Sequence, residues 1–307
     1  MKPHTIAAAA TILLLSALPL AAAAQGADIV VFGDSWSNRL SAPLQQTIID
    51  EGNAGTVLLN AAFEGERADG LSSNDPNIGL PYITATLAAN PNAELIHLSI
   101  GGNDLFDGVL FIGIDAIVNS IISDVVNDTE TIVNHILSER PDAQIYHSGY
   151  DYLVLPLLSP ARVNEVLLRL DARLIDLATT IPNYTYEGYY GWAQVNFGLP
   201  QLGLPPGDPA LPNDDFQSPG FTFVDEIHYT PAVYEFFADD LYENFYRERL
   251  AAPCVADVNG DGTLTPADFT AWVVAFNMGD VAADQNGDGL VSPADFSAWI
   301  SNFNAGC

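Results

Sequence analysis

The chain has 307 residues, enough for one α/β domain of ordinary size and a small second domain. Hydrophobic residues make up 49% of it and aromatic residues 10%, which indicates a packed core and excludes general disorder. The formal net charge is −30 and Lys2 is the single lysine, so the surface repels nucleic acids and anionic lipids and argues against a nucleic-acid-binding protein.

Residues 1–24 have the pattern of a secretory signal peptide. Lys2 precedes an apolar stretch from Ile6 to Leu20, and a run of four alanines ends just before Gln25. The alternative is a transmembrane anchor, but the apolar stretch is short for a membrane span and a strand-like segment follows it. We therefore expect a secreted or cell-surface protein with no transmembrane anchor.

From residue 25 to residue 250, strand-like apolar runs alternate with segments of helical period, which predicts a single domain over these residues. The predicted strands are residues 28–32, 56–60, 94–100, 144–147 and 184–187. One helix is predicted over residues 114–136, broken or frayed near Asp128. A second helix is predicted over residues 163–177. This alternation predicts an α/β fold with a parallel sheet covered on both faces and an active site at the carboxyl ends of its strands.

The last helix of this region has a clear start. Thr230 is its predicted N-cap and Pro231 its first residue. The apolar positions that it should bury are Val233, Phe237, Leu241 and Phe245.

Three of the predicted strands end in residues that could do chemistry. Ser35 follows the first strand, in Gly33-Asp34-Ser35-Trp36, where a serine at the start of a helix presents an exposed hydroxyl as a candidate nucleophile. Gly65 follows the second strand and can turn its backbone N–H into a cavity, and Asn103 follows the third and can donate its side-chain amide to a developing negative charge. Singly, each has an ordinary reading as a helix cap, a turn glycine or a loop residue.

A carboxylate and an imidazole precede the last helix. Asp225 and His228 are three residues apart, so the carboxylate can accept a hydrogen bond from one imidazole nitrogen while the other nitrogen faces Ser35. A histidine here could equally cap or pack. The order of the four motifs along the chain, rather than any one of them, indicates a catalytic site.

These four blocks resemble those of the SGNH hydrolase superfamily, also called GDSL esterases and lipases. The resemblance covers roughly residues 28–250 and implies a flavodoxin-like three-layer sandwich, with no cofactor in catalysis. It implies that Ser35 is the nucleophile, His228 the base and Asp225 the residue that orients it, and that the Ser35 amide, Gly65 and Asn103 form the oxyanion hole. Trp36 stands where the family name has leucine, and Ala62 where the second block often has glycine. Neither departure removes a catalytic group, but Trp36 makes substrate inference from lipase-like members unsafe.

Other features of this region are less specific. Residues 191–220 are rich in proline and glycine, and such a loop is either a lid that shapes the substrate pocket or a surface insertion. His97 and His135 lie inside a predicted strand and helix and are interpreted as structural. His147 ends the fourth strand at the expected active-site edge and is a weaker candidate for a substrate contact.

The end of the chain repeats itself with an offset of 27 residues. Residues 257–269 align with residues 284–296, and the match continues through Trp272 and Trp299. In each repeat, oxygen-bearing residues stand at the ligand positions of an EF-hand loop with glycine at the sixth, except that the last ligand is Asp instead of Glu. Such an oxygen-only, carboxylate-rich set selects Ca²⁺. The predicted ligands are Asp257, Asn259, Asp261, Thr263 (backbone), Asp268, Asp284, Asn286, Asp288, Leu290 (backbone) and Asp295.

These loops resemble the type I dockerin module, a small all-α domain of paired EF-hand type, here over residues 251–307. The resemblance implies two structural calcium ions and a cohesin-like partner in an extracellular assembly. However, Pro266-Ala267 and Pro293-Ala294 stand where many dockerins carry Ser or Thr recognition residues, so another secreted or cell-surface partner is the broader expectation. Cys254 and Cys307 bracket the segment and can pair in an oxidising compartment.

Together these patterns predict a secreted serine esterase that hydrolyses carboxylic esters through an acyl-serine intermediate. The expected substrates are small esters or acylated glycans, with acetyl groups on polysaccharides suggested by the association of dockerin-like modules with glycan-degrading enzymes. One alternative is a GDSL-type lipase or phospholipase. Another is a non-catalytic extracellular scaffold or binding protein that assembles through its calcium module.

Overall fold

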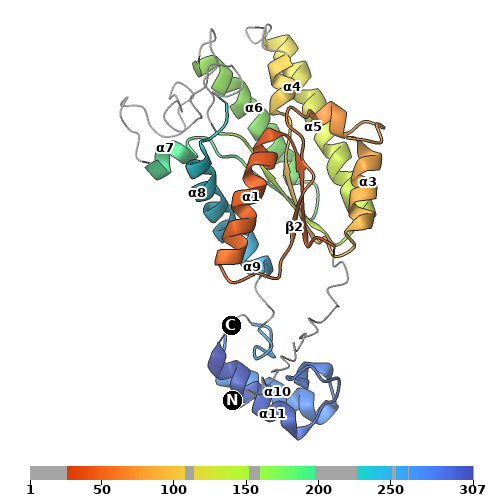
Figure 1. Ribbon diagram of the computed structural model, residues 1–307, viewed down its shortest axis with the longest axis vertical. Coiled ribbons are helices and arrows are strands. Elements are labelled where there is room, and N and C mark those ends of the chain that lie inside the picture. Colours follow the sequence, from red (N-terminus) through yellow and green to blue (C-terminus); the bar gives the residue numbers. More distant parts are fainter. Residues whose placement is uncertain are drawn as a thin grey trace, which may run out of the picture. The chain divides into compact units, whose positions relative to one another are not determined.

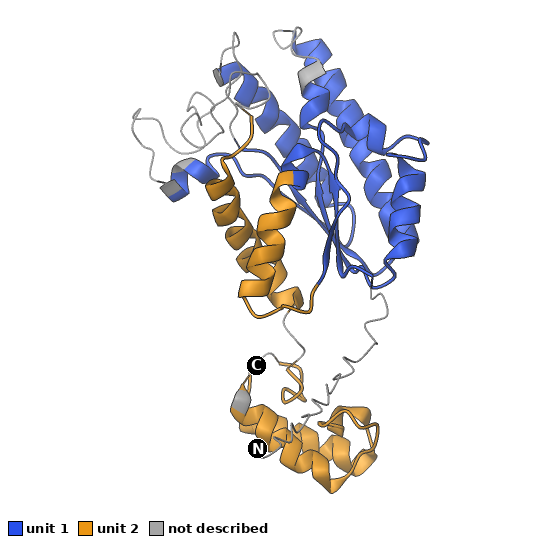
Figure 2. Cartoon of the chain, in the orientation of Figure 1, with its two compact units in different colours: residues 1–38, 57–214 blue, residues 39–56, 215–307 orange. Residues whose placement is uncertain are grey.

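A computed structural model of the chain describes residues 26–107, 114–151, 160–197, 227–250, 254–261 and 263–306. The chain forms two compact units, which are described one at a time (Figure 2). Unit 1 comprises residues 1–38 and 57–214, and unit 2 comprises residues 39–56 and 215–307. The predicted signal peptide lies outside the described residues, and the predicted domain boundary at residue 250 stays a prediction.

Unit 1 is built on a five-stranded sheet in which every neighbouring pair of strands is parallel. The strand order β2-β1-β3-β4-β5 is the flavodoxin-like order, which confirms the predicted parallel α/β sheet. All five predicted strands are present, and the second and third are each two residues shorter than expected. Their bounds are β1 (Ile29–Gly33), β2 (Leu58–Asn60), β3 (Leu95–Ser99), β4 (Gln144–Ser148) and β5 (Tyr184–Glu187). Strands β1 and β3 are buried throughout, as expected of the centre of a parallel sheet.

Helices that follow the strands pack together in unit 1. Helix α5 contacts α2, α3, α4 and α6, and α6 contacts β5 (Figure 1). Unit 1 therefore supplies the sheet and one helical layer of the expected sandwich. The bounds are α2 (Ala68–Leu71), α3 (Leu80–Ala89), α4 (Gly102–Asp107), α5 (Asp115–Glu139), α6 (Pro160–Ala178) and α7 (Trp192–Phe197).

The predicted break in α5 near Asp128 is wrong, because the helix is continuous. Its buried side chains continue past this point through Thr129, Ile132 and Val133. Asp128 is accommodated on the side of the helix, where its carboxylate accepts a hydrogen bond of 2.7 Å from the Ser72 hydroxyl. A polar residue at a partly buried position does not interrupt this helix, because it has a hydrogen-bond partner at the C-terminal end of α2.

The first part of unit 2 is helical. Helix α1 (Ser35–Asp50) crosses the boundary between the units, and α8 (Pro231–Leu241), the π-helix η2 (Tyr242–Tyr246) and α9 (Arg247–Leu250) follow one another. The Thr47 hydroxyl of α1 donates to Asp239 of α8 over 2.8 Å, which ties these distant segments together.

The prediction for the last helix of the hydrolase region is confirmed in its position and its buried face. Pro231 is its first residue after Thr230, although the Thr230 side chain makes no capping hydrogen bond. The four predicted apolar positions, Val233, Phe237, Leu241 and Phe245, are all buried.

The sequence repeat at the end of unit 2 is also a structural repeat. Helices α10 (Pro266–Met278) and α11 (Pro293–Ala305) each begin with a capping box, and the short 3₁₀ helix η3 (Val281–Ala283) lies between them. The indole of Trp272 donates to the carbonyl of Ala283, just before the second loop, and the indole of Trp299 donates to the carbonyl of Ala256, just before the first, both over 3.2 Å. Each repeat thus completes the core of the other.

Two findings bear on the expected location of the chain. In the part that the structure describes, no helix combines the length and apolarity needed to cross a membrane. Cys254, the cysteine within the described ranges, is not a free thiol. Cys307 lies outside the described residues, so the Cys254–Cys307 pairing stays a prediction.

Candidate active site

The candidate nucleophile is placed by a tight turn after the first strand. Gly33 ends β1 with φ +124°, and a Cβ atom on it would lie 2.0 Å from the carbonyl oxygen of Ser99, so only glycine fits. The Asp34 N–H donates to the same carbonyl over 2.9 Å, which ties the turn to β3. Ser35 follows as the first residue of α1, as predicted, but it is only 6% exposed rather than openly accessible.

The second candidate, Gly65, lies in the loop after β2. The Phe63 N–H donates to the Gly33 carbonyl over 2.9 Å, so this loop runs beside the turn that carries Ser35. Gly65 has φ +76°, while a methyl group added to it would meet no atom within 4 Å. Glycine is therefore favoured at position 65 by the backbone conformation and not by the space around it.

The third candidate, Asn103, contacts residues next to the other two. Its side-chain nitrogen donates to the backbone carbonyl of Glu66 over 2.8 Å and lies 3.5 Å from a carboxylate oxygen of Asp34. Glu66 is the neighbour of Gly65 and Asp34 is the neighbour of Ser35. The structure therefore brings the three predicted oxyanion-hole residues to one edge of the sheet, at the carboxyl ends of β1, β2 and β3.

Asp34 is buried directly behind this edge. Its carboxylate accepts hydrogen bonds from the Trp36 N–H over 2.9 Å and from the Tyr150 hydroxyl over 2.6 Å. Burial raises the pKa of Asp34 from 3.8 to about 7, against the lowering effect of these two hydrogen bonds. The contact with Tyr150 was missed by sequence reasoning, because a tyrosine in the loop after β4 carries no motif.

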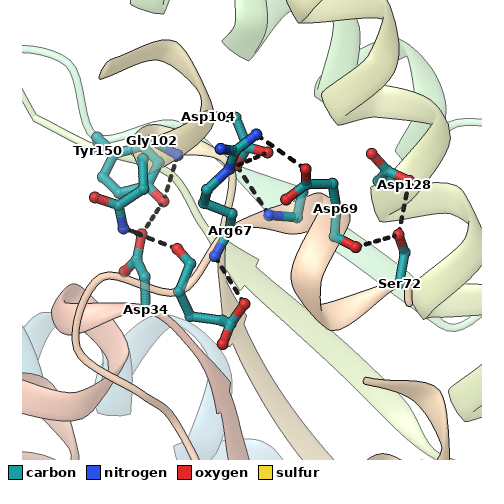
Figure 3. Close-up of polar contacts among 11 residues, drawn as sticks. Asp34, Arg67, Asp69, Ser72, Gly102, Asp104, Asp128 and Tyr150 are labelled. Atoms are coloured by element: carbon teal, nitrogen blue, oxygen red, sulfur yellow. Dashed lines mark hydrogen bonds and ion pairs between the residues drawn. The ribbon is translucent and has the colours of Figure 1, made fainter. Parts of the chain in front are cut away.

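A second buried carboxylate fixes the loop of Gly65. Asp104 accepts a hydrogen bond of 2.9 Å from the Ala68 N–H, and its other oxygen lies 3.7 Å from Nε of Arg67. Arg67 also forms an ion pair of 2.9 Å with Asp69 (Figure 3). Burial raises the pKa of Asp104 to about 6, against the Ala68 hydrogen bond and the Arg67 charge. Consecutive residues of α4, Asn103 and Asp104, therefore hold the segment after Gly65 at two points.

The base and its orienting acid are on other parts of the chain. His228 is 2% exposed and precedes α8 in unit 2. Asp225 lies outside the described residues. The Asp225–His228 half of the triad, and its approach to Ser35, therefore stay predictions.

The other three described histidines have partners within the fold, as expected of structural residues. His97 is buried and contacts the Ser148 hydroxyl over 3.1 Å, and burial lowers its pKa to about 3. His147 is also buried, with Nδ1 2.9 Å from the Tyr184 hydroxyl, and burial lowers its pKa to about 3. His147 thus lies in the interior, which argues against a contact with substrate. His135 contacts Thr84 over 2.8 Å on the helical layer.

The proline-rich loop is described only at its start. Helix α7 begins here, and the buried carboxylate of Asp151 accepts from the N–H groups of Gly191 and Ala193 over 2.9 and 3.0 Å. Residues 198–220 lie outside the described residues, so the lid and insertion alternatives both stay open.

In each predicted calcium loop, aspartate side chains accept hydrogen bonds from backbone N–H groups of the same loop. In the first loop, Asp257 accepts from the N–H groups of Gly260 and Asp261, and Asp261 accepts from that of Thr263. The second loop repeats these bonds with Asp284 and Asp288. The last predicted ligands, Asp268 and Asp295, are fully buried, and each accepts backbone N–H groups from both sides of its loop.

The donor chemistry of these loops suits a hard cation, since every side-chain donor is an oxygen. Within the described ranges, however, no three or more Asp, Glu, His or Cys side chains are gathered closely enough to hold a metal ion. The calcium assignment therefore stays a prediction.

Comparison with known proteins places the fold but not the activity. No protein-family model matches the chain. No curated protein matches it either. Among solved structures, the lipase Lip_vut3 from a goat rumen metagenome is similar over 72% of this chain and 98% of its own, with a TM-score of 0.50 and 13% identity. An acetyl esterase with a serine-to-alanine substitution and an acetate ion is similar over 73% of this chain and 98% of its own, with a TM-score of 0.50 and 10% identity. The chain therefore shares the fold of these ester hydrolases, as the SGNH resemblance implied.

Proposed function

We propose that the chain is a serine esterase that transfers an acyl group from a carboxylic ester to water. The observation that carries the proposal is the position of the Asn103 amide, 2.8 Å from the Glu66 carbonyl and 3.5 Å from Asp34. Because these partners adjoin Gly65 and Ser35, we infer that the Ser35 hydroxyl and three N–H donors converge at one edge of the sheet. That combination is what the addition of a serine to an ester carbonyl requires.

The first half-reaction forms an acyl-serine. Ser35 Oγ attacks the ester carbonyl carbon while His228, oriented by Asp225, accepts the hydroxyl proton. The N–H groups of Ser35 and Gly65 and the side-chain amide of Asn103 donate to the oxyanion. The intermediate collapses as the C–O bond to the alcohol breaks, and His228 returns the proton to the departing alkoxide.

The second half-reaction hydrolyses the acyl-serine with water, again with His228 as base, and releases a carboxylic acid and free Ser35. Asn103 can bond to Glu66 and to an oxyanion at the same time because an amide NH₂ has two donors. One donor is committed to Glu66. The other makes only the long 3.5 Å contact with Asp34, at the weak end of the hydrogen-bond range, and can turn to the oxyanion.

For the substrate, we propose short acyl groups, with acetyl esters of glycans as the leading class. One structural neighbour is named an acetyl esterase and another a lipase, so acetyl and long-chain esters are the two alternatives to compare. Trp36 favours a short acyl group because a large indole follows the nucleophile directly and is buried against the ring of Tyr150. Equal rates on acetylated xylan and on a long-chain triglyceride would contradict this preference.

The C-terminal repeats are proposed to bind two structural Ca²⁺ ions and to attach the esterase to another extracellular component. The duplicated loops, their all-oxygen donors and the absence of any basic residue after Cys254 support this role. Export by the residue 1–24 signal peptide would provide both the calcium and the oxidising conditions for the Cys254–Cys307 bond. A chain that serves only as a scaffold would retain this module and lack turnover.

The experiment that separates these functions is hydrolysis of p-nitrophenyl acetate by the wild-type chain and by Ser35→Ala. We expect turnover by the wild type and a loss of at least about 10³-fold in Ser35→Ala. Ser37→Ala is a matched control, because it removes a second buried hydroxyl of the same helix turn and should retain activity. An inactive wild type, with the calcium module intact, would favour the scaffold.

A further inference from the structure

Tyr150 joins two of the loops that carry the candidate site. Its hydroxyl donates to Asp34 over 2.6 Å and accepts from the Gly102 N–H over 2.9 Å (Figure 3). A tyrosine hydroxyl has one proton and two lone pairs, so it can make both bonds at once. Asp34 precedes the nucleophile Ser35, and Gly102 precedes the oxyanion donor Asn103. A single oxygen atom therefore connects the Asp34 carboxylate, next to the candidate nucleophile, with the Gly102 backbone, next to the candidate oxyanion donor.

The ring of Tyr150 is fixed as firmly as its hydroxyl. Tyr150 is 4% exposed, and its ring meets that of Trp36 edge to face with centroids 5.5 Å apart. After the neighbouring strand β3, a Cβ atom on Gly102 would lie 2.8 Å from Cζ of this ring. Glycine is therefore needed at position 102 for the ring to reach Asp34, and the hydroxyl has little freedom to move.

We propose that Tyr150 is a positioning residue that sets the distance between Ser35 and the Asn103 donor by holding Asp34 and Gly102 on one oxygen. The proposal rests on the esterase function proposed above. Tyr150 lies in the loop after β4, outside the four sequence blocks that carry the resemblance, so none of them assigns it a role. Because oxyanion donors act only when preorganised at the transition state, loss of this hydroxyl should lower kcat and leave KM nearly unchanged.

The same contact makes activity depend on pH in a specific way. The ionised Asp34 carboxylate is the better acceptor for Tyr150, the Trp36 N–H and Asn103, so full positioning requires its deprotonated form. The charged groups that act on it are Asp104 and Glu64, which both raise its pKa, whereas the Tyr150 hydrogen bond lowers it. Removing the hydroxyl should therefore raise the pKa of Asp34, and the acid side of the kcat profile should move to higher pH.

The test compares wild type and Tyr150→Phe in the full chain, with p-nitrophenyl acetate as the probe. We expect kcat to fall by roughly 10- to 100-fold with KM within about twofold, and the acid limb of kcat to move up by about one pH unit. Tyr146→Phe is the matched control. It also removes a buried tyrosine hydroxyl bonded to a carboxylate, that of Glu187 over 2.6 Å, but outside the site, and it should retain wild-type kcat and pH profile.

Three results would overturn the proposal: a Tyr150→Phe kcat within about twofold of the active wild type, an equal loss in Tyr146→Phe, or an unmoved acid limb. If Tyr150→Phe does not fold, Asp34→Asn tests the same contact from its other partner, with a similar fall in kcat expected and wild-type kcat contradicting it. A wild type that hydrolyses no ester would instead refute the proposed function, so the two failures are distinguishable.

Discussion

The side-chain amide of Asn103 donates to the backbone carbonyl of Glu66 over 2.8 Å, and this bond joins helix α4, which follows β3, to the loop after β2. Asn103 thus has two tasks in the proposed site. It holds the loop of Gly65 in place through one N–H, and it offers the other N–H to an oxyanion.

Replacement of Asn103 by alanine should lower kcat far more than it raises KM. One oxyanion donor is removed, and its loss costs about 3 kcal/mol of transition-state stabilisation, a fall of roughly 10²-fold. Steady-state kinetics with a nitrophenyl ester measures this. Asn77→Ala, which removes an exposed asparagine bonded to Asp75, is the control. A kcat for Asn103→Ala equal to that of the control would remove Asn103 from the site.

Asp104→Ala should destabilise the fold and reduce activity together. The change leaves the Ala68 N–H without its acceptor and removes one of the two carboxylates beside Arg67. The cost in unfolding free energy should be about 1–3 kcal/mol, because a buried donor loses its partner. Asp69→Ala removes the other, more exposed carboxylate and should cost under about 1 kcal/mol. Urea unfolding measures both variants, and equal costs would contradict the account.

Gly33→Ala should be among the most damaging single methyl additions to this chain. The new Cβ atom would lie 2.0 Å from the Ser99 carbonyl at a φ of +124°. Strain and displacement of β3 should cost about 3 kcal/mol or more. Gly52→Ala is the comparison: φ is +95° there, but no atom lies within 4 Å of the added Cβ, so only the backbone cost of about 1 kcal/mol is expected. A similar melting temperature for the two variants would refute the crowding argument.

Asp171→Asn should change how stability depends on pH. Burial raises the pKa of Asp171 from 3.8 to about 6, so between pH 4 and 6 the folded chain keeps a proton that the unfolded chain has lost. Stability from this group is therefore present at low pH and is lost as pH rises to about 6. The difference in unfolding free energy, Asp171→Asn minus wild type, should therefore increase by roughly 2 kcal/mol between pH 4 and pH 7, because the variant lacks this pH-dependent loss.

The measurement is chemical unfolding of Asp171→Asn and wild type at both pH values. Asp176→Asn, an exposed change on the same helix, should stay within about 0.5 kcal/mol of wild type at each pH. A stability difference between Asp171→Asn and wild type that is the same at pH 4 and pH 7 would contradict the assigned cause.

Calcium should stabilise the C-terminal repeats cooperatively. Seven aspartates and no basic residue follow Cys254, so a bound cation relieves their mutual repulsion. Removal of calcium with EDTA should change the fluorescence of Trp272 and Trp299, because each indole donates to the backbone next to the opposite loop. Isothermal titration should count two sites in wild type and one in Asp284→Asn, while Asp280→Asn, outside the loops, should retain two. No heat of binding would refute the calcium assignment.

Patterns local in sequence predicted most of the fold. The five apolar runs gave the strands, and the glycines at positions 33 and 65 marked backbone conformations that the structure confirms. Contacts that decide the site were beyond such patterns: Tyr150 and Asp34 are 116 residues apart, and nothing in the local sequence of either residue points to the other. The predicted break at Asp128 is wrong for the same reason, because its partner Ser72, at the end of α2, is 56 residues away in the sequence.

The central claim is that Ser35 forms a covalent bond with the substrate acyl group. The most direct measurement is mass spectrometry of the chain treated with a fluorophosphonate, followed by peptide mapping. The account predicts one phosphonyl group per molecule, attached to Ser35 and absent from Ser35→Ala. A wild type that hydrolyses esters while the label maps to another residue, or while no label forms, would contradict it.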